Sequence, residues 1–518
     1  MTDGFGEPSY RSLTMPAAKP DIVLINPRSR EQVYQGLGNR LAAIENPVWS
    51  GLMASFIRHK GLSVEVIDAE ADELTREEVA DQVANFDPVL TVIVVYGHQP
   101  SASTQIMPAS SALCSTLKDH EPGRRILMVG GHVAALPAES LADEEADYVA
   151  SGEGLYTMVE LAQALKSSNR PDLSKVRGLW YYDGGKIQCT ANPPLVKDLE
   201  HEMPGIAWDL FDVQNYRAHN WHCFDTLERQ PYAAIYTTLG CPYHCSFCCI
   251  QAPFKSGEKE LGIKETVNSY RFWSPELVIK ELDYLAGQGV RNIKIADEMF
   301  VLNQRHVMGI CDLIIERGYD FNFWAYARID TVKDGMLPKM KQAGFNWFAF
   351  GIEAANERVQ ADANKRFEND EIYRVVEEVK RHGIHVIGNY IFGLPEDDHD
   401  SMQETLDMAL ELNCEFGNFY SAMAYPGSPL YLTALAEGLE LPTHWSGYSQ
   451  HSADSKPLPT KYLSSAEVLR FRDEAFQKYF TAPSYRQLVL DKFGQDTLDH
   501  IDDMCSHSLK RDLLEAAA

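Results

Sequence analysis

The 518-residue sequence lacks long hydrophobic runs and a targeting segment. It has no stretch of about eighteen apolar residues, the length that a membrane-spanning helix needs. Its first twenty residues do not show the basic region and apolar core of a secretory signal peptide. We therefore expect a cytoplasmic protein.

Positive charge is also scarce. The 47 lysines and arginines face 74 aspartates and glutamates, which gives a formal net charge of -27 at pH 7. Such a field repels polyanions, so the composition disfavours binding to nucleic acid or to an anionic membrane surface. We expect a small-molecule substrate instead.

The first part of the chain lacks the two common phosphate-binding motifs. No G-x-G-x-x-G follows the apolar run that ends at Asn26, and no G-x-x-x-x-G-K-[ST] occurs anywhere. A nucleotide site in a glycine-rich sheet remains an alternative, but these absences weaken it.

Two series of alternating strands and helices are present. Residues 21–165 alternate short β-branched runs with helical stretches, which predicts an α/β, doubly wound, Rossmann-like domain. Residues 231–438 repeat the rhythm and predict a partial or full (β/α) barrel of the TIM type. One barrel helix is expected to begin at Ser274-Pro275 and to end near Gly287.

The other segments are assigned by exclusion. We predict an N-terminal tail over residues 1–20 and a connector over 166–230, with short strands around 178–182. The C-terminal residues 439–518 are expected to be helical, with a polar loop at 449–459. At this length two or three domains are expected, each able to enclose a sizeable ligand.

Four of the ten cysteines lie in one short segment, and three of them show the spacing of a metal site. Cys241, Cys245 and Cys248 form a Cys-x3-Cys-x2-Cys pattern just after the first strand of the second series. Three thiolates can hold three irons of a cubane and leave the fourth iron open to another ligand. Zinc is the alternative, but it usually needs a second, separate pair of ligands. Cys249 or His244 is the available fourth ligand in that case.

This pattern, with the aromatic Phe247 before the last cysteine, resembles the radical S-adenosylmethionine (SAM) superfamily. The resemblance implies a [4Fe–4S] cluster on Cys241, Cys245 and Cys248, which are then the catalytic and metal-binding residues. SAM binds the open iron and is cleaved to a radical after reduction. The electron comes from an external donor of the flavodoxin or ferredoxin type.

Later motifs resemble the strand ends that hold SAM in this superfamily. Asp297 and Glu298 match the acidic strand end that meets the SAM ammonium group, and Glu353 matches the glutamate that binds the ribose. Arg328 matches an arginine common in the same subgroup. Each residue alone also has a structural interpretation as a cap or an ion-pair partner.

The first domain resembles the cobalamin-binding domain that is fused to many radical SAM enzymes, with Gly130-Gly-His132 and Gly152-Glu-Gly154 as its signatures. The resemblance implies cobalamin, including its methyl form, as a second cofactor. The cofactor-contact candidates at the expected strand ends are Tyr96, His98, Gln99, Ser101, Ser103, Thr104, Gly130, Gly131, His132, Gly152, Glu153 and Gly154.

One expected motif is missing from that domain. The sequence Asp-x-His-x-x-Gly, whose histidine ligates cobalt from below, does not occur. His98 and His132 are the visible candidates for cobalamin contact, although a lone loop histidine is more often a hydrogen-bonding residue. The sequence does not identify the residue that faces the lower side of cobalt.

The combined resemblance implies a methyltransferase. Such enzymes move a methyl group from SAM through cobalamin to an unactivated carbon, or to a phosphinate phosphorus, of a natural-product precursor. Two alternatives remain: a radical SAM and cobalamin enzyme of another reaction type, such as an oxidative cyclase or a rearrangement enzyme, and a non-catalytic cobalamin sensor.

Overall fold

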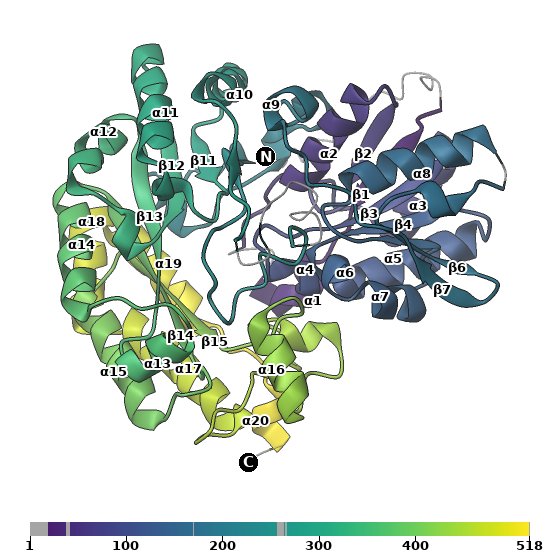
Figure 1. Ribbon diagram of the computed structural model, residues 1–518. Coiled ribbons are helices and arrows are strands. Elements are labelled where there is room, and N and C mark those ends of the chain that lie inside the picture. The colour runs from purple at the N-terminus through teal and green to yellow at the C-terminus, as the bar shows by residue number, and fades with distance from the viewer. Residues whose placement is uncertain (1–18, 38–41, 169, 256–263, 265–266, 517–518) are drawn as a thin grey trace, which may run out of the picture.

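The computed structural model describes residues 19–37, 42–168, 170–255, 264 and 267–516. Figure 1 shows two α/β units side by side, with C-terminal helices packed on the second unit. No helix of the described residues is long and apolar enough to cross a membrane.

The first sheet has seven strands in the order β2-β1-β3-β4-β5-β6-β7. Strands β1 to β5 pair in parallel, and β6 and β7 add an antiparallel edge. Its strands are β1 (Ile22–Asn26), β2 (Val64–Asp68), β3 (Leu90–Val95), β4 (Ile126–Gly130), β5 (Tyr148–Ala150), β6 (Leu179–Asp183) and β7 (Lys186–Cys189). The strand order reverses between β1 and β3, the place where doubly wound sheets bind ligands.

Both faces of this sheet are covered by helices. Ile22 and Leu24 of β1 belong to one hydrophobic core, while Val23 and Ile25 belong to the core on the opposite face. Continuous apolar strands are expected when a parallel sheet is buried on both sides. The helices are α1 (Arg30–Tyr34), α2 (Val48–His59), α3 (Arg76–Phe86), α4 (Ala102–Gln105), α5 (Met107–His120), α6 (Gly131–Ala135), α7 (Pro137–Asp143) and α8 (Leu155–Ser167).

The segment predicted as a connector contributes to the first sheet. Its strands β6 and β7 extend that sheet at the β5 edge, and the predicted strand near 178–182 is confirmed as β6. Helix α9 (Leu199–Glu202) and short 3-10 helices at 208–210, 213–215 and 221–223 follow. The exact division of the chain at residues 165 and 230 stays a prediction.

The second sheet has six parallel strands in the order β15-β14-β13-β12-β11-β8. Because β8 and β15 do not pair with each other, the barrel is partial. Its strands are β8 (Tyr232–Ile235), β11 (Asn292–Ile295), β12 (Asn322–Ala327), β13 (Phe345–Glu353), β14 (His385–Phe392) and β15 (Phe416–Ser421). The predicted fold class, a Rossmann-like domain followed by a partial barrel, is confirmed.

Helices follow the strands of the second sheet. The predicted helix start is confirmed: α10 begins at Pro275, and the Ser274 side chain accepts a hydrogen bond from the Leu277 amide at 3.2 Å. The other helices of this unit are α11 (Gln304–Arg317), α12 (Leu337–Gln342), α13 (Glu357–Asp362), α14 (Asn369–Arg381), α15 (His399–Leu412) and α16 (Pro429–Glu437).

The C-terminal region is helical, as predicted. Its elements are α17 (Ser465–Phe480), α18 (Pro483–Phe493), α19 (Gln495–Ser506) and α20 (Asp512–Ala516). Helix α17 covers the last strands of the barrel, where Arg472 donates to the Phe419 carbonyl at 2.8 Å and Tyr479 to the Cys414 carbonyl at 2.6 Å. The region therefore buries one end of the sheet that carries the site.

The two units meet at β8, an edge strand of the barrel. Asn46 from the first unit accepts a hydrogen bond from the Ala234 amide at 2.7 Å and donates to the Ala234 carbonyl at 3.0 Å. Edge strands leave such backbone groups unpaired unless another segment covers them. The segment before α2 thus completes the edge of β8 and holds the two sheets together.

Candidate functional site

The loop that carries the three cysteines follows β8 and the short strand β9 (Thr238–Leu239), which pairs antiparallel with β10 (Arg271–Phe272). Gly240 makes the turn into this loop with φ of +91°, and a Cβ atom here would lie 2.4 Å from the Ser269 carbonyl oxygen. Only glycine has that conformation without strain and leaves room for Ser269. The position of Cys241 therefore depends on Gly240.

Three amide side chains, from the cysteine segment itself and from later in the barrel, hold the backbone of the cysteine loop. Gln251 donates to the Cys241 carbonyl at 2.7 Å, Asn268 to the Tyr243 carbonyl at 2.6 Å and Asn364 to the His244 carbonyl at 2.8 Å. These bonds satisfy polar groups of an irregular segment that has no ladder of its own. The loop is thus a fixed scaffold for its thiols.

The thiols of Cys241, Cys245 and Cys248 are half-buried and form no disulfide. Burial raises the pKa of the Cys241 thiol to about 12 and that of Cys248 well above its ordinary value. Coordination to a metal removes the proton from such a thiol. Among the described residues, no three histidine, cysteine, aspartate or glutamate side chains converge on a position for a single metal ion. Three accessible thiols on one anchored loop fit a cluster with one open iron.

Arg328, predicted near SAM, lies beside the cysteine loop. Its guanidinium stacks on the Tyr243 ring, 3.7 Å from the centroid, and one nitrogen is 3.9 Å from the Cys245 sulfur. Asp330 accepts two hydrogen bonds from the same guanidinium at 3.0 and 3.1 Å. The structure therefore places Arg328 against the loop with its charge paired.

The two adjacent acidic residues after β11 differ in their environment. Asp297 is fully buried and accepts hydrogen bonds from the Thr237 amide at 2.6 Å and from the hydroxyls of Thr237 and Thr238 at 2.5 and 2.9 Å. Burial raises its pKa to about 6, although these donors oppose the shift. Asp297 thus anchors the segment that leads to Gly240.

Glu298 keeps one oxygen free of internal hydrogen bonds. Its Oε1 accepts from the Tyr236 hydroxyl at 3.3 Å, but its Oε2 is buried with no hydrogen-bond partner among the described residues. Burial raises the pKa of this carboxyl to about 8. A buried acceptor without a donor is costly, and the ammonium group of SAM would supply one. Of the two predicted acids, Glu298 is the better placed to bind it.

Glu353, the predicted ribose ligand, ends β13 in a left-handed conformation with φ of +66°. Lys365 donates to its Oε1 at 2.6 Å, and both side chains are nearly buried. A Cβ atom on Gly351 would lie 2.4 Å from this carboxylate and 2.5 Å from the Lys365 nitrogen. Gly351 thus makes room for the pair, and Lys365 orients Glu353.

A cavity lies between the two units. It encloses about 990 Å³ of empty space, including the part open to solvent, and we call it the interdomain cavity. Its walls come from the carboxyl ends of β1 and β3, from the segment before α2, and from residues just after β8 and β11. Lining residues include Asn26, Arg30, Tyr34, Glu45, Trp49, Glu70, Tyr96, His98, Gln105, His219, Tyr236 and Ala296. The cavity lies at the predicted strand ends, and its mixed polar and apolar walls suit a bound ligand.

Two of the predicted cobalamin contacts line this cavity. Tyr96 stacks on Trp49 with ring centroids 4.3 Å apart, and its buried hydroxyl has no hydrogen-bond partner in the described part of the chain. His98 follows two residues later in the same loop. Gln99 and Ser101 continue this loop and are half-buried, outside the residues found to line the cavity.

Three other predicted contacts bond to one another. The Ser103 hydroxyl donates to the Val95 carbonyl and accepts from the His132 amide at 2.8 Å. Thr104 Oγ1 lies 3.1 Å from His132 Nδ1. Ser103, Thr104 and His132 are buried and do not line the interdomain cavity. They join the carboxyl ends of β3 and β4.

The predicted glycines serve close approaches between strand ends. A Cβ atom on Gly130 would lie 2.1 Å from the Val95 carbonyl oxygen, and one on Gly154 would lie 2.0 Å from a Val129 methyl carbon. Gly131 faces Ser103 at ordinary contact distance. Gly152 lines a smaller, separate pocket with Glu153 and Gly154.

Glu153 lies in a buried ion pair between the two units. Arg271 of β10 donates to it at 2.6 and 3.3 Å, and the Val196 amide donates to it at 3.0 Å. The same arginine donates to the Val196 carbonyl at 2.6 Å. Because β10 pairs with β9 directly before the cysteine loop, this junction connects the first unit to that loop.

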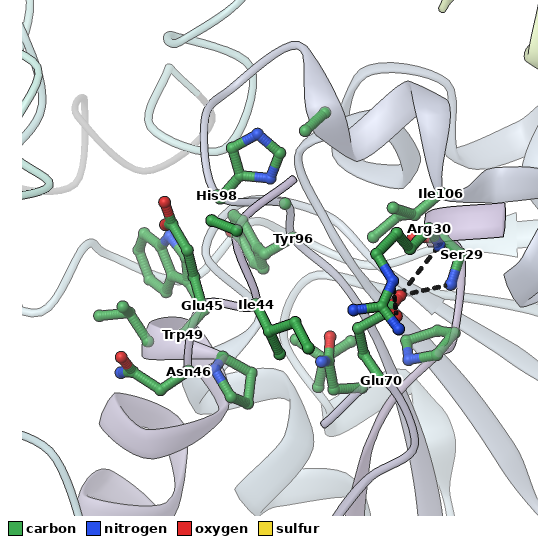
Figure 2. Close-up of a pocket in the computed structure, with 18 of the residues that line it drawn as sticks. Ser29, Arg30, Ile44, Glu45, Asn46, Trp49, Glu70, Tyr96, His98 and Ile106 are labelled. Atoms are coloured by element: carbon green, nitrogen blue, oxygen red, sulfur yellow. Dashed lines mark hydrogen bonds and ion pairs between the residues drawn. The ribbon is translucent and has the colours of Figure 1, made fainter. Parts of the chain in front are cut away.

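The sequence analysis missed two charged pairs at the interdomain cavity. At one end, Arg30 is 4% exposed and lies 3.4 Å from Glu70 (Figure 2). At the other end, Lys294 of β11 has a 1% exposed side chain and lies 2.9 Å from Glu45. A lysine between two isoleucines of a buried strand is the one sequence signal that was available for the second pair.

Comparisons with known proteins agree with this geometry. The Radical SAM superfamily model matches residues 235–409, and the B12 binding domain model matches residues 34–162. An uncharacterized methyltransferase of Pyrococcus horikoshii is 27% identical over 474 residues, covering 91% of this chain and 94% of the relative. An anaerobic magnesium-protoporphyrin IX monomethyl ester cyclase of Cereibacter sphaeroides is 25% identical, covering 86% of this chain and 68% of the relative.

A solved structure shares the fold. The radical SAM methyltransferase TsrM from Kitasatospora setae, with cobalamin and a [4Fe–4S] cluster bound, superposes with a TM-score of 0.65 at 15% identity and 90% coverage of each chain. At that identity the likeness establishes the architecture alone.

The fold and the cysteine loop define a radical SAM enzyme with a cobalamin-binding domain. The chain belongs to the radical SAM superfamily and carries its B12-binding domain at the N-terminal side of the barrel. Its cofactors are a [4Fe–4S] cluster, SAM and cobalamin, as predicted. The zinc and nucleotide alternatives are thereby set aside, while the individual contact residues stay predictions.

Proposed function

We propose that this enzyme transfers a methyl group from SAM, by way of cobalamin, to a small-molecule precursor. The acceptor in this proposal is an unactivated carbon or a phosphinate phosphorus. The observation that carries it is the position of the interdomain cavity, whose walls come from the carboxyl ends of both sheets. When bound, the cluster with SAM supplies one-electron chemistry, and cobalamin supplies a carrier for the methyl group.

The residues of this chain would hold the two reactants near each other. Tyr236 lines the interdomain cavity and also donates to Glu298, which has a free oxygen for the SAM ammonium. Cys241, Cys245 and Cys248 would hold the cluster, five to twelve residues after Tyr236. The Trp49–Tyr96 stack covers part of the wall and would keep water out of the reaction space. An external flavodoxin- or ferredoxin-type donor supplies the electron in this proposal.

The names of two kinds of relative support different reactions. The Pyrococcus relative is named a methyltransferase and spans nearly the whole chain, whereas the Cereibacter relative is named a cyclase. An oxidative cyclase is therefore the second candidate. Both would use the same cofactors, so the fate of the SAM methyl group separates them.

The test uses the holoenzyme and SAM with a deuterated methyl group. The protein is reconstituted anaerobically with iron, sulfide and reduced cobalamin, and the bound cobalamin is extracted for mass spectrometry. A methyltransferase places the deuterated methyl group on cobalamin without any substrate. Unlabelled cobalamin together with 5′-deoxyadenosine release would favour the cyclase. Unlabelled cobalamin without any 5′-deoxyadenosine release would favour a cobalamin sensor.

A cysteine variant provides the matched control. Replacing Cys241, Cys245 and Cys248 together by alanine should remove bound iron and 5′-deoxyadenosine release, while cobalamin remains bound in the first unit. Undiminished iron content and turnover in this variant would refute the assignment of the cluster.

A further inference from the structure

The loop after β3 carries one side chain with the chemistry of a cobalt ligand. His98 lies two residues beyond Tyr96 at the carboxyl end of this strand and lines the interdomain cavity. The strand order reverses between β1 and β3, so this loop borders the place where a doubly wound sheet binds its ligand. Figure 2 shows the His98 ring beside the Glu45 carboxylate at one end of the cavity.

The backbone of His98 is held from the barrel. Lys294 donates to the His98 carbonyl at 2.9 Å and pairs with Glu45 at 2.9 Å. Lys294 is almost completely buried, so its hydrogen bond to the His98 carbonyl joins the two units and is shielded from solvent. The loop therefore has a fixed position at the cavity wall.

The ring of His98 is available for a ligand. It forms no hydrogen bond with any residue that the structure describes, and its nearest charged neighbours are Glu45, Lys294 and His219. His219 lies 3.4 Å from Glu45, so the same carboxylate is a neighbour of both histidines. Carboxylates beside metal-binding histidines orient the imidazole and raise its basicity.

The other candidate side chains are engaged elsewhere. His132 bonds to Thr104, packs edge-on against Trp445 at 4.4 Å and does not line the interdomain cavity. The Tyr96 ring lies flat on Trp49, and its hydroxyl lies in the field of Glu153 and Arg271 at the junction of the units. His98 is thus the one of the two predicted histidines whose ring faces the cavity.

We infer that His98 supplies an axial nitrogen ligand to cobalt, from the side of the first unit. This inference rests on the proposed binding of cobalamin in the interdomain cavity. It assigns to the loop after β3 the ligand that the missing Asp-x-His-x-x-Gly motif would otherwise provide. Glu45 is a positioning residue in this arrangement, because it acts through the imidazole.

Electron paramagnetic resonance of the holoenzyme in the cobalt(II) state tests the ligand directly. A nitrogen ligand splits each cobalt line into three, and a nitrogen-15 ligand splits it into two. We expect three-line splitting in protein grown with ordinary histidine and two-line splitting in protein grown with nitrogen-15 histidine. The isotope distinguishes a protein nitrogen from the base of cobalamin itself.

Two variants identify the residue. His98→Ala should lose the isotope-sensitive splitting, whereas His132→Ala should keep it. Splitting that is absent, or that does not respond to labelled histidine, would overturn the inference even if His98→Ala failed to fold. Cobalt content per chain is measured first: cobalt bound without histidine splitting refutes only this inference, whereas no bound cobalt also contradicts the proposed function.

Discussion

Replacing Lys294 by methionine should reveal how strongly the two units are coupled. The Lys294 and Glu45 side chains are 1% and 8% exposed, so the substitution leaves a carboxylate buried without its main cation. Breaking one side of a buried ion pair costs about 3–5 kcal/mol. His219 at 3.4 Å and the Tyr232 hydroxyl at 3.3 Å still contact Glu45, so we expect the lower end, about 3 kcal/mol.

The Glu45–Lys294 pair should also affect how the stability of the protein depends on pH. Burial disfavours the Glu45 carboxylate, but Lys294 and His219 outweigh burial and hold its pKa below the ordinary value. A carboxyl with a lowered folded pKa stabilises the protein above its unfolded pKa, and this stability is lost as the pH falls toward the folded value. The Lys294→Met variant should therefore lose less stability than wild type when the pH is lowered.

Urea unfolding of the cofactor-free protein, followed by circular dichroism, measures this effect. Adding Glu45→Gln to Lys294→Met should restore most of the lost stability, because neither position then carries an unpaired buried charge. Lys339→Met is the matched control: Lys339 pairs with Asp312 on the surface at 2.6 Å, and such pairs contribute about 1 kcal/mol or less. Equal stability of the single and double variants would refute the reasoning.

Three further predictions concern the site and its supports. Glu298→Gln should weaken equilibrium binding of SAM to the reconstituted enzyme about 10- to 100-fold, because a hydrogen bond to a charged group contributes about 1.5–3 kcal/mol. Gly240→Ala should cost about 1–3 kcal/mol of stability and lower iron content per chain, since φ is +91° and the Ser269 carbonyl oxygen would lie 2.4 Å from the new Cβ. Glu281→Gln should flatten the pH dependence of stability: burial raises the Glu281 pKa from 4.5 to about 7, so wild-type stability falls as the pH rises between these values, by up to about 3 kcal/mol.

Each of these predictions has its own check. An unchanged SAM dissociation constant in Glu298→Gln would show that this carboxylate does not meet the ammonium group. Gly287→Ala serves as the control for Gly240→Ala, because a Cβ at Gly287 meets nothing within 4 Å, and equal iron loss in both would contradict the steric argument. For Glu281→Gln, thermal unfolding is measured at pH 5 and pH 8. If stability changes equally between these pH values in wild type and variant, the pKa of Glu281 is ordinary and the prediction is wrong.

Two ion pairs hold the two units in a fixed arrangement. Glu153–Arg271 connects the turn after β5 to β10, and Glu45–Lys294 connects the segment before α2 to β11. Both pairs are buried, and both lie next to segments that carry predicted cofactor contacts. A shift of one unit would therefore change the relative positions of the cysteine loop and the interdomain cavity.

The sequence by itself determined the features that depend on local order. The spacing of Cys241, Cys245 and Cys248 is local, and so are the apolar runs that become parallel strands and the Ser274-Pro275 helix start. The apolar runs predicted the order of the two units. The family and the cofactors followed from the resemblance of the cysteine motif and of the Gly130-Gly-His132 and Gly152-Glu-Gly154 segments to known families, because short local motifs set what one loop can bind.

Only the tertiary structure decided which predicted residues remain available for ligands. Asp297 and Glu298 are neighbours in sequence, yet the threonines after β8 occupy the first and leave an oxygen of the second free. Glu153 meets Arg271 across 118 positions of sequence, and Lys294 meets Glu45 across 249. Such pairings depend on which strand ends face each other, and a single sequence does not encode that contact in any local pattern.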